Sequence, residues 1–114
     1  MDREIIILLE QKLDIMKELL NITQSISEII KKDDTEELLK VFKSRQQLME
    51  AIDLLDSKLL KFFKDDKDAL IKYLTSDIKI RAVYDNVLSL IKEIKEIDDA
   101  NLESIKNAFS KIKE

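Results

Sequence analysis

One long amphipathic helix can be read directly from residues 35–63, and it constrains the fold more than any other part of the chain. Apolar side chains recur there in alternating steps of three and four, with a single arginine among them. The seam consists of Leu38, Val41, Arg45, Leu48, Ile52, Leu55, Leu59 and Phe62. This spacing places the seam on one side of an α-helix about 45 Å long. Such a helix buries its apolar side against other helices, so the sequence predicts a helical bundle.

The composition excludes most alternatives to a bundle. The 114 residues include no glycine and no proline, which tight turns and sheet-rich folds normally require. Charged residues make up 39% of the chain and hydrophobic residues 45%, a balance typical of long amphipathic helices. We therefore expect an all-α, coiled-coil-like bundle formed by a single domain of residues 1–114.

Short polar clusters divide the chain into three long helices. The first is expected at 3–31 and the second at 35–63, with Asp34 as the N-cap of the second. Because the connection is so short, these two helices should form an antiparallel hairpin. The last helix is expected at 78–113. Between the hairpin and the last helix, residues 67–74 fit a short extra helix as well as they fit an irregular linker.

Several functional classes are excluded by charge and by missing residue types. The net charge is −4, and the charges alternate instead of forming the basic face of a nucleic-acid-binding protein. The chain has no cysteine and no histidine, which removes the usual ligands of zinc and haem. The apolar run at 5–9 is too short for a membrane span or a signal sequence. We expect a cytoplasmic protein without membrane insertion, metal or cofactor.

Three polar residues interrupt the apolar seams. Arg45 lies in the seam of the second helix, and Asp98 and Asn101 lie in the seam of the last helix. The simplest interpretation of Arg45 is an ion pair with a carboxylate that fixes the register of the helices. Asp98 and Asn101 either form a polar layer or mark the boundary between a packed half of the helix and a mobile, partner-binding half.

No catalytic site is expected from these patterns. Small helical enzymes resembling chorismate mutase bind a dicarboxylate through several arginines, but the chain's three arginines lack the spacing of that fold. The paired aspartates at 33–34, 65–66 and 98–99 are explained by helix caps and turns. A non-enzymatic role is therefore the prediction.

A second, interrupted apolar stripe runs along the helix at 35–63. It either packs as core or forms a hydrophobic groove for a helix of another protein. Its members are Leu39, Phe42, Met49, Leu60 and Phe63. As a hypothesis, the far end of the last helix regulates this groove by covering it when no partner is bound. The apolar residues of that end are Leu102, Ile105, Phe109 and Ile112.

Two segments carry a resemblance to a known family. They are the residues Ser-Arg-Gln-Gln-Leu-Met at 44–49 and Ile-Asp-Asp-Ala-Asn-Leu at 97–102, and the similarity extends over about residues 35–105. Together they resemble the FlgN- and FliT-type flagellar export chaperones, and Asp98, Asn101 and Leu102 form the most specific part of the match.

The resemblance implies a cytoplasmic chaperone without enzymatic activity. Such chaperones hold the C-terminal helical segment of a late flagellar subunit, either the filament cap or a hook-associated protein, until it is exported. They also dock on the export gate or its ATPase complex. The chain's length is nearer to the shorter, cap-type chaperones, and the gate-docking tyrosine of the longer type has no counterpart after Tyr84. The alternative is a self-associating coiled-coil or adaptor protein that forms a homodimer.

Overall fold

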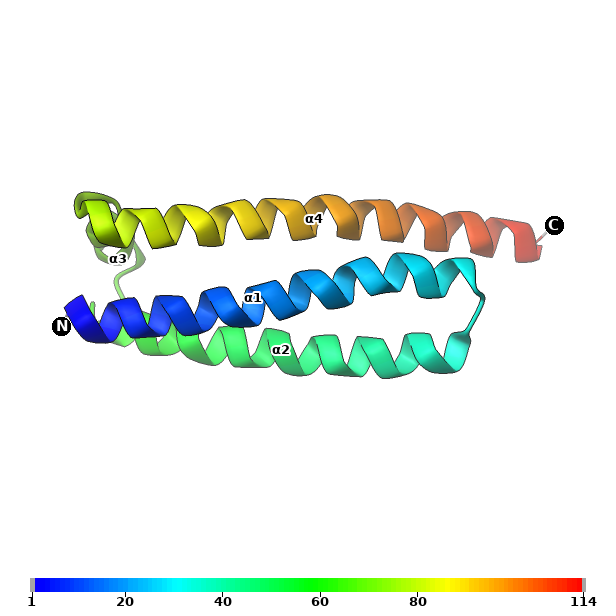
Figure 1. Ribbon diagram of the computed structural model, residues 1–114, viewed down its shortest axis with the longest axis horizontal. Coiled ribbons are helices and arrows are strands. Elements are labelled where there is room, and N and C mark those ends of the chain that lie inside the picture. The colour runs from blue at the N-terminus through cyan, green and yellow to red at the C-terminus, as the bar shows by residue number, and fades with distance from the viewer. Residues whose placement is uncertain (1, 114) are drawn as a thin grey trace.

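The computed structural model describes the backbone of residues 2–113 and the side chains of residues 2–107. Four helices follow one another: α1 (Asp2–Lys31), α2 (Thr35–Lys61), α3 (Lys67–Ser76) and α4 (Ile78–Lys113). α1 and α2 form an antiparallel hairpin, and α4 lies along α1 and is parallel to it (Figure 1). The all-α prediction is confirmed, and the extra helix is a separate element that links α2 to α4.

Aspartates shape the breaks between the helices. Asp34, Asp66 and Asp77 each accept hydrogen bonds from backbone N–H groups two or three residues later, at 2.8 to 3.2 Å. These bonds satisfy N–H groups that have no partner within the helix, so each helix start is fixed. In a chain without glycine, the left-handed backbone positions at the turns are occupied by Asp33 (φ 56°) and by residues 64–65 (φ 51° and 63°).

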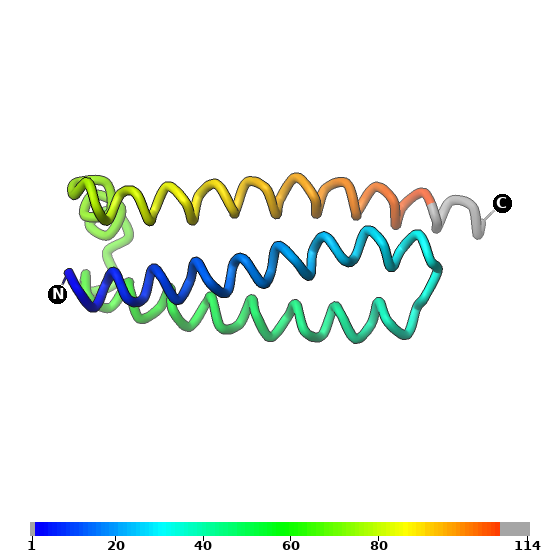
Figure 2. The backbone as a smooth tube through the Cα atoms, viewed as in Figure 1, coloured from blue at the N-terminus to red at the C-terminus, as the bar shows by residue number. Residues whose placement is uncertain are grey.

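α1 is the central helix, because α2 and α4 both pack along it (Figure 2). Its buried side chains are spaced three, four or seven residues apart, so they share one face: Ile5, Leu9, Met16, Leu19, Thr23, Ile26 and Ile29. One core cluster at the α3 end combines Ile5 and Leu9 with Leu59, Leu74 and Ile80. A second cluster further along contains Met16, Leu19, Val87 and Ile94.

The expected packing fails at the end of α2. Phe62 was assigned to the buried seam, but it is 39% exposed, and Phe63 instead packs against the core cluster at the α3 end. The Phe63 ring lies 5.2 Å from that of Tyr73, measured between centroids. The physical reason is that α2 ends at Lys61: the N–H groups of Phe62 and Phe63 bond to carbonyls three residues earlier, so the backbone turns more tightly than in an α-helix.

The backbones of α2 and α4 lie apart from each other. In the described part of the chain, no Cα atom of α2 lies within 8 Å of a Cα atom of α4. The two helices meet different parts of the α1 surface, and the space between them is therefore bounded by three helices. None of the described helices is both long enough and apolar enough to cross a membrane.

Candidate functional site

A groove runs between α2 and α4, with α1 as its floor. Its middle part encloses about 400 Å³, and a second part of about 240 Å³ continues toward α3. Lys12 and Asp56 line both parts, so they stand at the boundary between the two. We call this combined space the α2/α4 groove.

Apolar side chains form most of the groove surface. In the middle part, the buried Met16 and Leu19 form the floor, while Met49 and Ile91 stand on opposite walls and are 41% and 42% exposed. Toward α3 the lining is also largely apolar and includes Leu60, Leu70, Ile71, Leu74 and Tyr84. Partly exposed apolar walls on two helices whose backbones lie apart are suited to receive a third apolar element.

An ion pair crosses the groove floor where its two parts meet. The Lys12 Nζ donates to Asp56 Oδ1 at 2.7 Å, and the two side chains are 15% and 46% exposed. Lys12 occupies the step between Leu9 and Met16 in the buried line of α1. Lys12 therefore occupies a position on the buried face of α1, with buried apolar residues about one turn away on either side.

A second ion pair joins the two walls. The Arg45 guanidinium donates from both terminal nitrogens to the two oxygens of Asp98, at 2.6 and 2.5 Å. Within the described residues this is the one side-chain bond between α2 and α4. A bidentate pair fixes the relative orientation of the guanidinium and the carboxylate as well as the distance between them. Arg45 and Asp98 therefore hold the two walls at a set separation.

Next to this pair, Asn101 ties α4 to α1. Asn101 is 6% exposed, accepts a hydrogen bond from Ser27 Oγ at 2.6 Å and donates to the Thr23 carbonyl at 3.1 Å. The Thr23 hydroxyl in turn donates to the Leu19 carbonyl at 2.7 Å. Asp98 and Asn101 thus form a polar layer across the three long helices, and α4 remains packed on α1 as far as this layer.

The stripe predicted on α2 is distributed over three environments. Met49 and Leu60 line the α2/α4 groove. Leu39 and Phe42 are 64% and 38% exposed, and Phe42 precedes Met49 by seven residues, so it continues the same face toward the hairpin turn. Phe63 lies in the core instead.

The predicted regulatory end of α4 is only partly described. Leu102 is 51% exposed and Ile105 is half-buried, whereas the side chains of Phe109 and Ile112 lie outside the described residues. α4 is a continuous helix to Lys113 (Figure 1). These residues therefore extend the line of α4, and their covering of the groove stays a prediction.

Lys12, Ile71 and Ile91 are among the groove residues that sequence reasoning missed. A signal existed for Lys12, because it takes the central step in the regular series from Ile5 to Leu19. Ile91 stands on the α4 wall of the groove and is 42% exposed. Its exposure follows from the separation of α4 from α2, which the sequence of one helix does not reveal.

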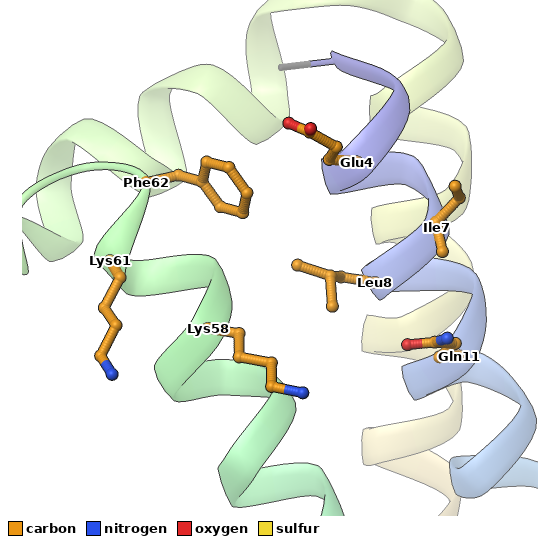
Figure 3. A pocket seen from close by; sticks show the side chains of 7 residues that line it. All are labelled: Glu4, Ile7, Leu8, Gln11, Lys58, Lys61 and Phe62. Atoms are coloured by element: carbon orange, nitrogen blue, oxygen red, sulfur yellow. The ribbon is translucent and has the colours of Figure 1, made fainter.

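A different cleft lies between α1 and α2 and encloses about 690 Å³. Figure 3 shows Leu8 and Phe62 pointing toward each other across it, with Lys58 and Lys61 on the α2 side. None of its lining residues belongs to α4. It is therefore a separate surface from the α2/α4 groove. Among the described residues no group of three or more acidic side chains is arranged to hold a metal ion.

Comparison with known proteins identifies a family. Searches of curated proteins and of solved structures found no match to this chain. A family model described as FlgN protein matches residues 1–114, which is the whole of the sequence. The chain therefore belongs to the FlgN family of flagellar export chaperones.

Proposed function

We propose that the α2/α4 groove holds an amphipathic helix from the C-terminal segment of a late flagellar subunit, the filament cap or a hook-associated protein. The observation that carries the proposal is that the backbones of α2 and α4 both lie close along α1 but not close to each other. This arrangement leaves open the position that the fourth helix occupies in a four-helix bundle. A chaperone of this family needs a surface for its export substrate, and a largely apolar groove between two helices is suited to that role.

The apolar surface available is large enough for useful affinity. Each large apolar side chain of the client would contribute about 1.5–3 kcal/mol when buried. Half-exposed groove residues would add about 1 kcal/mol each, among them Met49, Ile71 and Ile91. Five such client side chains outweigh the lower range of association costs and reach the 8 kcal/mol or so of a micromolar complex. The bound helix would meanwhile be shielded from premature assembly.

The proposal is tested with charged substitutions on both walls. Met49→Asp and Ile91→Asp should each weaken the binding of the client's C-terminal peptide by at least about tenfold, because an aspartate would be desolvated under the peptide. Matched controls are Leu54→Asp on α2 and Ile78→Asp on α4, which replace exposed side chains (58% and 89%) outside the groove. Calorimetry with cap and hook-associated peptides measures the affinities. Equal losses in the groove and control variants would contradict the proposal.

The remaining expectations for the family are part of the same proposal. The chaperone acts without catalysis in the cytoplasm, and the loaded complex docks on the export gate or its ATPase complex. A second copy of the chain is the competing occupant of the groove. Light scattering separates the two cases: a monomer that takes up peptide fits the chaperone role, and a homodimer that ignores the peptide fits an adaptor.

A further inference from the structure

The ion pair between Lys12 and Asp56 affects which helices the groove can bind. Most of the exposed surface of both parts is apolar, although charged side chains also stand along the walls of the middle part. Lys12 and Asp56 are the charged pair at the junction of the two parts. Asp56 Oδ1 accepts from Lys12, whereas Oδ2 has no hydrogen-bond donor among the described side chains. With Asp56 46% exposed, water can solvate this second oxygen as long as the groove is empty.

A helix seated in the groove would remove that water. A purely apolar helix would leave a carboxylate oxygen buried without a donor, which opposes binding. The other charges of the middle part also favour a client with a hydrogen-bond donor or a positive charge. Outside the two ion pairs, the middle part is lined by two acidic residues, Asp53 and Asp99, and by one cation, Lys95. A client helix that carries a hydrogen-bond donor opposite Asp56 replaces the lost water and avoids this cost in binding free energy.

We propose that Lys12 and Asp56 select the client: the groove accepts a helix whose apolar face carries one hydrogen-bond donor, a Lys, Arg, Gln or Asn side chain, opposite Asp56. This inference rests on the proposed function of the groove. Met49 lies seven residues before Asp56 and Leu60 four residues after it, and both are groove-lining apolar residues. The donor in the client is therefore flanked on both sides by large apolar residues at helical spacing.

The test combines changes on both partners. Each Lys, Arg, Gln or Asn on the apolar face of a C-terminal cap or hook-associated peptide is replaced by Leu, one at a time. The peptides are titrated into the full chain and into the double variant Lys12→Met/Asp56→Leu. This variant is expected to fold, because Met and Leu both favour helices and apolar residues often replace an ion pair without loss of stability. Circular dichroism checks the fold before titration.

A matched control variant removes an ion pair elsewhere. Arg81→Met/Asp85→Leu deletes the same kinds of charge from α4, at a pair whose side chains are both 61% exposed and which lines no part of the groove. It should bind every peptide as the unmodified chain does.

The expected result is position-specific. One Leu replacement should weaken binding to the unmodified chain by about tenfold or more, and the same peptide should bind the double variant without that loss. If all Leu peptides bind the unmodified chain equally well or better, or if the loss persists in the double variant, the selection by Lys12 and Asp56 is refuted while the groove proposal stands. If none of the unmodified peptides binds, the proposed function fails and this inference fails with it.

Discussion

The ion pair between Arg45 and Asp98 should be measurable as a coupling between α2 and α4. Its side chains are 19% and 31% exposed, so it lies between a surface pair and a buried one. Surface pairs contribute about 0–1 kcal/mol, and removing one partner of a buried pair costs about 3–5 kcal/mol. We therefore expect Arg45→Ala and Asp98→Ala each to lower the free energy of unfolding by about 2 kcal/mol, with a coupling energy of about 1.5 kcal/mol in the double-mutant cycle.

The effect on thermal stability follows from chain length. Unfolding entropies of about 2.1 cal/mol/K per residue give about 0.24 kcal/mol/K for a chain of 114 residues. A loss of 2 kcal/mol then corresponds to a decrease in Tm of about 8 °C. Thermal and urea denaturation followed by circular dichroism measure both quantities.

An exposed pair on α1 provides the control cycle. Glu28 and Lys31 are 66% and 73% exposed and 3.6 Å apart, so their coupling energy should stay below about 0.5 kcal/mol. If the Arg45 and Asp98 cycle gives a coupling as small as this control, the two residues do not hold the walls of the groove together. The reasoning about a fixed groove width would then be wrong.

Two further predictions concern the ends of helices. Asp34→Ala removes the bond from the Glu37 N–H to the cap of α2 and should lower the free energy of unfolding by about 1 kcal/mol, whereas Asp68→Ala, an exposed residue without a cap bond, should change it little; urea denaturation distinguishes them. Truncation after Ser104 removes most of the predicted regulatory end but retains Asn101 and its bonds to α1, and it should tighten client binding if that end competes for the groove. Weaker binding by calorimetry would instead make this end part of the client-binding surface.

The helices and their caps could be predicted because they depend on local sequence. The steps of three and four on α2, and the acidic cluster at Asp34, act over a few residues, and the structure has the corresponding helix and cap. The prediction that Phe62 is buried is wrong because Phe62 lies just beyond the end of α2, where the spacing of an α-helix no longer determines which side chains are buried. The sequence does not decide between a helix and a linker at α3 for a similar reason, because short segments carry little periodic signal.

The site was less predictable because it depends on how the helices are rotated about one another. The sequence indicated that Arg45 would pair with a carboxylate, but several aspartates were available, and the packing of α4 selects Asp98. Met49 and Leu60 were identified as groove candidates from α2 alone. The opposite wall, with Ile91, and the charged floor at Lys12 depend on the gap between α2 and α4, which no single-helix pattern specifies.

The most direct test is to find where the client helix lies on the chaperone. Methyl-labelled chaperone and unlabelled client peptide are examined by NMR for intermolecular NOEs. We predict NOEs from the peptide to the methyl groups of Met49 and Ile91, which lie on the two walls of the α2/α4 groove, and none to Leu54. NOEs confined to Ile7 and Leu8, in the cleft between α1 and α2, would place the client on the other surface and contradict the groove as its binding site.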